Sequence, residues 1–224
     1  MQKGTDISLA MLQNAAAIPV TVIGGFLGAG KTTLLNYIMS ENHGVRAGVL
    51  VNDFGAINID AKLVVGVEGE TINLANGCVC CTVRDDLIAA CLGLLQQANP
   101  TEVLIIETSG VSEPVQVSNT FLMPELQSKL RLNSILVVVD AEQFPKLRKE
   151  EAALAQLQIE AADMVVLNKV DLVNNKNLEA VRIKIREIAP RSRTIEARYG
   201  RVPMELLLDQ GHVDTQLTQA SALS

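Results

Sequence analysis

Residues 20–36 read VTVIGGFLGAGKTTLLN, and this stretch decides the fold of the chain. The apolar, partly β-branched run at 20–23 predicts a buried strand, and helical spacing begins at Lys31. Between them, residues 25–32 form the pattern G-x4-G-K-T, which binds phosphate when it follows a strand and opens a helix. The segment therefore predicts a P-loop.

The residue types of this loop indicate how a nucleoside triphosphate binds. Glycines let the backbone wrap closely round phosphate oxygens, and the N–H groups and the helix N-terminus present partial positive charge to them. We expect Lys31, a catalytic residue, to reach the β- and γ-phosphates, and Thr32 to offer its hydroxyl to Mg²⁺. Thr33 is placed to touch the α-phosphate. The expected nucleotide contacts of the loop are Gly25, Gly28, Ala29, Gly30, Lys31, Thr32 and Thr33.

A second strand should bring a carboxylate to the same sheet edge. Residues 103–110 read VLIIETSG, four apolar residues followed by Glu107. An unpaired carboxylate at the end of a core strand is costly, so a role in catalysis is expected for Glu107, near Mg²⁺ or the attacking water. The alternative is a solvated strand end. The backbone N–H of Gly110 is then placed to donate to the γ-phosphate.

A third strand ends in a motif that selects the base. Residues 164–171 read MVVLNKVD, an apolar run followed by Asn168, Lys169 and Asp171. Guanine presents a ring N–H beside an exocyclic amine, and one carboxylate can accept from both, so Asp171 predicts guanine and hence GTP and GDP. We expect Asn168 to brace the loop and contact the base, and the stem of Lys169 to cover the ring face. The backbone N–H of Ala197 is expected to close the base pocket.

Three of the four cysteines lie within four positions, as Cys78, Cys80 and Cys81. This clustering suits a reducing cytosol and thiolate chemistry rather than a disulfide framework. Three thiolates favour zinc or cobalt, and an open fourth coordination position suits a metal that is to be released. A buried reduced cluster and a redox pair are the alternatives. Cys91 follows helical spacing and is expected in the core, and Asp53 is a candidate ligand for Mg²⁺ or for the carried metal.

The remaining pattern predicts an α/β class with three layers, a mostly parallel central sheet with helices on both faces, because the strands are continuously apolar. Expected strands are 20–23, 48–51, 103–106, 135–139 and 164–167, with a short one near 193–195 and a hairpin or edge strands at 63–67 and 71–74. Expected helices are 31–39, 83–97, 124–131, 145–160 and 177–188. We expect an N-terminal extension at 1–17, one P-loop GTPase domain at 18–208 and a polar C-terminal tail at 209–224.

Composition excludes several classes of protein. Nineteen Lys and Arg against 25 Asp and Glu leave a net charge of −6, and aromatics make up only 3%, which argues against a nucleic-acid partner. No apolar run reaches the roughly 20 residues of a bilayer span, so no membrane partner is expected. The N-terminal stretch does not read as a secretory signal, and a cytoplasmic protein is expected.

Together these motifs identify a family. The order GGFLGAGKTTLLN (24–36), NDFG (52–55), GCVCC (77–81), ETSGVSEP (107–114) and NKVD (168–171) closely resembles the CobW-like metallochaperone GTPases, over about residues 18–208. The resemblance implies GTP binding by residues 25–33 and 168–171, and transition-metal binding by the three clustered cysteines. Family members commonly carry Glu at the positions of Asp53 and Ala56, and many have a His-rich stretch, whereas this chain has two His. Most also have a further C-terminal domain, so either a truncated chain or a short form is expected.

The expected function is that of a GTP-binding and GTP-hydrolysing metallochaperone that carries zinc or cobalt to a client metalloprotein. The alternatives are a zinc-sensing GTPase switch without metal transfer, and a nucleotide-dependent assembly factor with structural cysteines. The motifs identify no arginine finger or catalytic glutamine. We therefore expect slow intrinsic turnover that a client or a homodimer partner accelerates.

Overall fold

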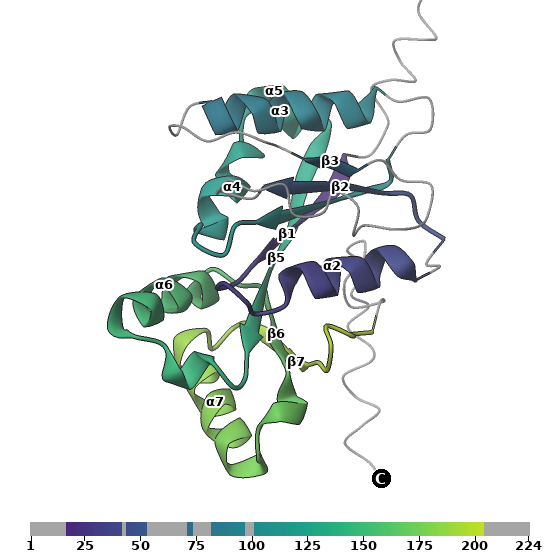
Figure 1. The fold of residues 1–224 in the computed structure, drawn as a ribbon. Helices are drawn as coiled ribbons and strands as arrows, with labels where there is room; N and C mark the ends of the chain where they lie inside the picture. Colours follow the sequence, from purple (N-terminus) through teal and green to yellow (C-terminus); the bar gives the residue numbers. More distant parts are fainter. Residues whose placement is uncertain (1–16, 42–43, 53–70, 74–81, 97–100, 204–224) are drawn as a thin grey trace, which may run out of the picture.

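A seven-stranded sheet, in which every strand pair is parallel, organises the chain. The computed structural model describes residues 17–41, 44–52, 71–73, 82–96 and 101–203 (Figure 1). The strands are β1 (Ile18–Gly24), β2 (Ala47–Asn52), β3 (Thr71–Asn73), β4 (Val103–Thr108), β5 (Leu130–Asp140), β6 (Met164–Asn168) and β7 (Arg193–Glu196). Their order across the sheet is β3-β2-β4-β1-β5-β6-β7, so β1 is the central strand.

Helices cover both faces of this sheet, as the sequence predicts. They are α2 (Lys31–Ser40), α3 (Thr82–Leu95), α4 (Pro114–Thr120), α5 (Pro124–Gln127), α6 (Lys149–Glu160) and α7 (Asn175–Ile188), with the short 3-10 turns η1 (Phe144–Lys146) and η2 (Val170–Leu172). Helix α2 packs on one face, and α3 to α7 lie over the other (Figure 1). The expected α/β class with three layers is confirmed.

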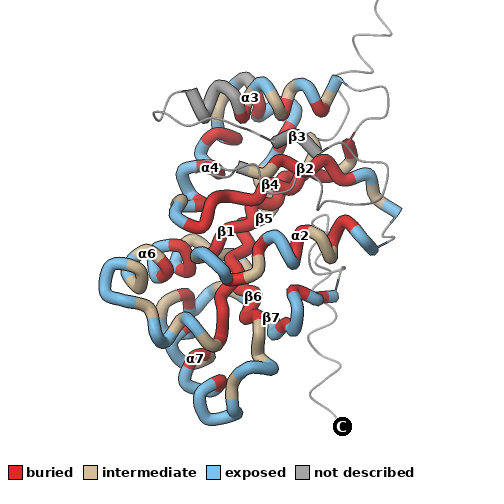
Figure 2. The backbone as a smooth tube through the Cα atoms, in the orientation of Figure 1, coloured by how far each residue is buried: buried red, intermediate tan, exposed pale blue. Residues whose placement is uncertain are grey.

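Side-chain alternation along the strands builds two separate apolar cores. Val22 of β1 and Ile106 of β4 face the core shared with α3 and α7, whereas Ile23 and Ile105 face α2. Because both faces of a central parallel strand are covered, β4 is buried at every position (Figure 2). Cys91 of α3 lies in the first core at 0% exposure, as predicted. Burial raises the pKa of its thiol to about 12, so this cysteine stays neutral at physiological pH.

The register of the sheet brings the ends of four strands to one edge. Ile23 of β1 pairs with Glu107 of β4, and Gly24 pairs with Val137 of β5. At the next pair of strands, Asp140 of β5 lies opposite Asn168 of β6. Loops that follow parallel strands leave at the same edge, and such an edge, where the chain changes direction across the sheet, is the usual ligand crevice. The motifs separated in sequence therefore gather there.

Three elements differ from the sequence-based expectation. Residues 130 and 131, expected in a helix at 124–131, begin β5, because α5 ends after one turn and Leu130 pairs with β1. The helix expected at 145–160 is divided into η1 and α6, and Pro145 stands in η1. Helix α4 was not predicted; it begins at Pro114, a residue that favours the first helical turn.

Other expectations lie outside the described residues. These are the strand at 63–67, the N-terminal extension, the C-terminal tail, the cluster Cys78, Cys80 and Cys81, and Asp53. β3 is an edge strand parallel to β2, in line with the edge alternative for 71–74. Within the described part of the chain, no helix has the length and apolarity needed to cross a membrane.

The core of β4 supports a graded stability prediction. Ile106 is 0% exposed, so Ile106→Val should lower the free energy of unfolding by about 1 kcal/mol and Ile106→Ala by about 3–4 kcal/mol. Ile183 is 47% exposed on α7, and Ile183→Ala should change it by no more than about 0.5 kcal/mol. Urea unfolding measures all three. Equal losses for Ile106→Ala and Ile183→Ala would contradict the packing described here.

Candidate functional site

The P-loop, residues 25–30 between β1 and α2, is packed so closely that side chains are excluded at two glycines. Gly25 has φ 134°, and a Cβ there would lie 2.2 Å from the carbonyl oxygen of Val138 on β5. Gly30 has φ 102° and caps α2, and its Cβ would lie 2.4 Å from Nδ2 of Asn168. Only glycine fits such positions without strain. The phosphate loop is therefore held directly against the ends of β5 and β6.

Lys31 lies at the first position of α2 and is buried. Its Nζ donates to the carbonyl oxygens of Gly25 at 3.0 Å and of Phe26 at 3.4 Å. The ammonium group is thus held against the loop that precedes it, and its contact with the β- and γ-phosphates stays a prediction. An ammonium group has three N–H donors and binds phosphate as a compact positive charge.

Thr32 and Glu107 meet across the strand ends. The hydroxyl of Thr32 donates to Oε1 of Glu107 at 2.8 Å, and Glu107 is only 5% exposed. This contact joins two motifs separated by 75 residues and contradicts the alternative that Glu107 is a solvated strand end. A hydroxyl and a carboxylate are oxygen ligands of the kind that Mg²⁺ prefers, so the pair fits a magnesium site.

Asn168 connects three segments. Its Nδ2 donates to the carbonyl oxygen of Ala29 in the P-loop at 3.0 Å, and its Oδ1 accepts from the backbone N–H of Gly200 at 3.0 Å. Asn168 is 1% exposed, so neither contact is shared with bulk water. The residue predicted to brace the base loop therefore ties that loop to the P-loop and to the segment after β7.

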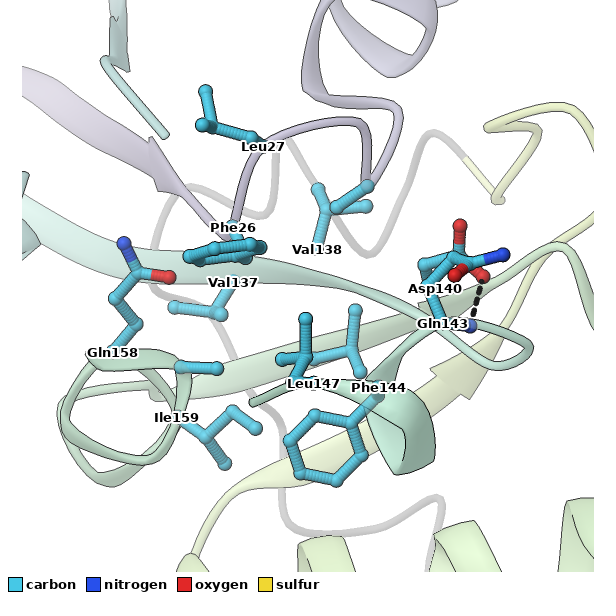
Figure 3. Close-up of a pocket in the computed structure, with 13 residues that line it drawn as sticks. Phe26, Leu27, Val137, Val138, Asp140, Gln143, Phe144, Leu147, Gln158 and Ile159 are labelled. Atoms are coloured by element: carbon cyan, nitrogen blue, oxygen red, sulfur yellow. Dashed lines mark hydrogen bonds between the residues drawn. The ribbon is translucent and has the colours of Figure 1, made fainter. Parts of the chain in front are cut away.

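Lys169 makes a second tie, through a residue that the sequence analysis missed. Its Nζ donates to the carbonyl oxygen of Gly28 at 2.8 Å and lies 2.7 Å from Oδ2 of Asp140. The other oxygen of Asp140 accepts from the backbone N–H groups of Glu142 and Gln143, the latter contact drawn in Figure 3. Asp140 is 6% exposed at the end of β5 and is fixed by the turn that follows. It therefore fixes Lys169 in turn.

These contacts orient the P-loop for an anion. The carbonyl oxygens of Gly25, Phe26, Gly28 and Ala29 all accept from the side chains of Lys31, Lys169 or Asn168. In a planar trans peptide, the N–H points away from the C=O. Because Asn168 holds the carbonyl group of Ala29, the N–H of Gly30 in the same peptide is fixed in the opposite direction. Backbone N–H groups fixed in this way are what an anion-binding nest requires.

The remaining predicted residues divide into three groups. Thr33 and Asp171 are exposed, on α2 and η2, and Gly110 is buried in the loop after β4. The N–H of Ala197 donates to the carbonyl oxygen of Leu167 at 2.9 Å, so it is already paired within the sheet, contrary to the expectation that it is open to the base. The three clustered cysteines and Asp53 are outside the described residues. Among the described residues, no group of three or more potential metal ligands occurs.

Removal of the Asn168 side chain should lower the stability of the chain even when no ligand is bound. Asn168→Ala removes both hydrogen bonds and leaves their buried partners unpaired, so the free energy of unfolding should fall by about 2–3 kcal/mol. Asn177→Ala, at an exposed position of α7, is the control and should stay within about 0.5 kcal/mol. Urea unfolding compares the two variants. A free energy of unfolding that Asn168→Ala leaves unchanged would show that the loops are not joined through this amide.

Comparison with known proteins shows which family and which relatives this chain resembles. The profile described as "CobW/HypB/UreG, nucleotide-binding domain" matches residues 19–196. The chain is 36% identical over 226 residues to "Zinc chaperone CobW" of Sinorhizobium sp, covering 88% of this chain and 64% of that protein. It is 33% identical to "Zinc-regulated GTPase metalloprotein activator 1" of Dictyostelium discoideum, covering 88% of this chain and 49% of that protein. The chain thus spans about half to two thirds of the length of these relatives.

Solved structures agree with the fold. The structure described as Zn(II)-bound YjiA GTPase from E. coli superposes with a TM-score of 0.65 at 26% identity, covering 86% of this chain and 61% of that one. HypB from Helicobacter pylori in complex with nickel, at 18% identity and a TM-score of 0.56, shares the fold over 88% of this chain and 87% of its own. With a family profile that covers most of the chain, this protein belongs to the CobW/HypB/UreG family through its nucleotide-binding domain.

Proposed function

We propose that this protein binds and hydrolyses GTP and acts as a metallochaperone, carrying zinc on Cys78, Cys80 and Cys81 to a client metalloprotein. The observation that carries the nucleotide part is the attachment of the base loop to the P-loop. Asn168 and Lys169 each donate to a P-loop carbonyl oxygen, so base and phosphate contacts belong to one preorganised unit. The names of the zinc chaperone relatives support the metal part.

Guanine is selected by Asp171. Asp171 is exposed in η2, two residues after Lys169, the second of the two residues that are tied to the P-loop. It can accept from the ring N–H and the exocyclic amine of guanine, which adenine does not offer side by side. The stem of Lys169, fixed by Asp140, is placed to cover one face of the base.

Hydrolysis depends on the Thr32 and Glu107 pair and on Lys31. When bound, Mg²⁺ supplies positive charge that neutralises the β- and γ-phosphate oxygens. Glu107 accepts from the Thr32 hydroxyl, which leaves the hydroxyl lone pairs available to the metal and fixes their direction. Lys31 moves a donor from the Gly25 carbonyl oxygen to phosphate, where a charge-assisted bond is stronger. Turnover is slow until a client or a homodimer partner completes the site.

Zinc is the cargo in this proposal. Thiolates bind zinc and also cobalt, and three of them leave the fourth tetrahedral position for a ligand from the client. Coupling to the nucleotide is reciprocal: if GTP tightens zinc binding, zinc tightens GTP binding by the same factor, typically about 5- to 150-fold. GTP hydrolysis then weakens the hold on zinc and lets the client take it.

Exchange of one side-chain group tests base selection. Asp171→Asn replaces one carboxylate acceptor by an amide N–H donor, which faces the N–H donors of guanine and makes no hydrogen bond with them, so GTP affinity should fall by about 100-fold or more. Xanthosine triphosphate, which has an oxygen in place of that amine, should gain affinity. Fluorescent-nucleotide titration measures both, with Glu150→Gln as a control that removes an exposed carboxylate on α6. Equal binding of ATP and GTP by the unaltered chain would refute guanine selection.

The metal part has its own test. Co²⁺ titrated into the reduced chain with Mg²⁺ and a GTP analogue should give thiolate-to-metal absorption at one equivalent, and Cys80→Ser should abolish it. Cys91→Ala is the matched control, because the buried neutral thiol of Cys91 does not ligate metal. With GDP the affinity should be lower. Identical affinity with both nucleotides would exclude a GTP-gated carrier, and zinc that never appears in an apo client after hydrolysis would exclude delivery.

A further inference from the structure

Gln158 of α6 is a polar residue in a place where apolar packing would be expected. It is 0% exposed and lies between Ala155 and Ile159, which are also buried. Figure 3 shows it on the wall of a small pocket whose other lining side chains include Phe26, Val137 and Phe144. A buried amide costs free energy unless its polar atoms are hydrogen-bonded, so its contacts indicate what it does.

Both N–H groups of this amide are used on one loop. Nε2 of Gln158 donates to the carbonyl oxygen of Gly110 at 3.2 Å and to that of Ser112 at 2.8 Å. Its Oε1 is buried and finds no hydrogen-bond partner among the described residues. The two hydrogen bonds that the amide donates are therefore the interactions that explain a polar side chain at this buried position. Gln158 therefore serves the loop after β4.

The same loop contacts the P-loop on its other side. A Cβ at Gly110 would lie 2.7 Å from the backbone nitrogen of Leu27, so the two backbones touch there. Ser112 N–H donates to the carbonyl oxygen of Ser109 at 3.0 Å, which closes a turn over residues 109–112. This turn is thus held between the P-loop and Gln158, and it begins two residues after Glu107.

We propose that Gln158 is a positioning residue that fixes the 109–112 turn where the backbone N–H of Gly110 meets the third phosphate. It thereby makes the chain discriminate GTP from GDP. This inference rests on the proposed function, because it concerns the nucleotide of that same site. The physical reason is preorganisation: a turn fixed beforehand loses no conformational entropy when its N–H binds a phosphate oxygen. GDP, which lacks that phosphate, gains nothing from the fixed turn.

The test compares two nucleotides on the full chain. Gln158→Met keeps the unbranched shape in an apolar pocket and removes both donors. Affinity for a non-hydrolysable GTP analogue should fall by about tenfold, the scale of one or two neutral hydrogen bonds, while GDP affinity stays within about twofold. Gln156→Leu, at an exposed position of the same helix, is the matched control and should leave both affinities unchanged.

A purely structural role gives a different result. If Gln158 only stabilises α6, Gln158→Met lowers the Tm and weakens both nucleotides equally, and that outcome overturns the proposal. An unchanged GTP-to-GDP affinity ratio overturns it as well, although the proposed function then stands. If the unaltered chain binds no guanine nucleotide, the proposed function itself is refuted, and this is seen before any variant is compared.

A second variant keeps the test informative if the methionine variant does not fold. Gln158→Glu keeps the shape, and burial favours the neutral carboxyl, which carries one O–H donor in place of two N–H donors. The GTP-to-GDP affinity ratio should then fall by an intermediate factor of about two to four. A ratio equal to that of the unaltered chain would overturn the proposal.

Discussion

The side-chain amide of Asn168 is the contact on which the candidate site depends. It joins the carbonyl oxygen of Ala29, in the loop after β1, to the backbone N–H of Gly200, in the segment after β7. The two strands that precede these segments, β1 and β7, are not neighbours in the sheet. The contact forms because β1, β6 and β7 are parallel and end at one edge, and because Gly30 has no side chain to occupy the space beside Nδ2. Without this amide, the base and phosphate loops would lack their buried link.

Much of the sheet could be predicted because its strands are continuous apolar runs. β4 and β6 have few polar residues before their last positions, and this is typical of strands that are covered on both faces. β5 was predicted too short, since Arg131 and Asn133 interrupt the apolar pattern near its start. Those polar side chains are tolerated because the first part of β5 is only partly buried. The start of β5 was missed because its local composition does not indicate a strand, whereas its pairing with β1 makes it one.

The candidate site could be predicted wherever a motif states both residue type and spacing. Asp140 and Gln158 belong to no such motif, and their contacts depend on how β5 and α6 are placed in the fold. A signal was present for Asp140, because an apolar run followed by an acid was the same argument used for Glu107. Gln158 also carried one: a polar residue beside Ala155 and Ile159 on the buried side of a helix requires a partner.

The way in which the P-loop is held bears on the cost of binding. Lys31, Lys169 and Asn168 already fix four of its carbonyl groups, so under the proposed function a polyphosphate meets a loop whose peptide orientation is largely set. Association costs less when loops need not be ordered on binding. Under the proposed function, Lys31 exchanges a carbonyl partner for a charged oxygen, whereas Lys169 keeps its ion pair with Asp140. The base side of the site then stays constant, and the third phosphate is met by Lys31 and by the loop after β4, where Gln158 and Leu27 hold the turn from opposite sides.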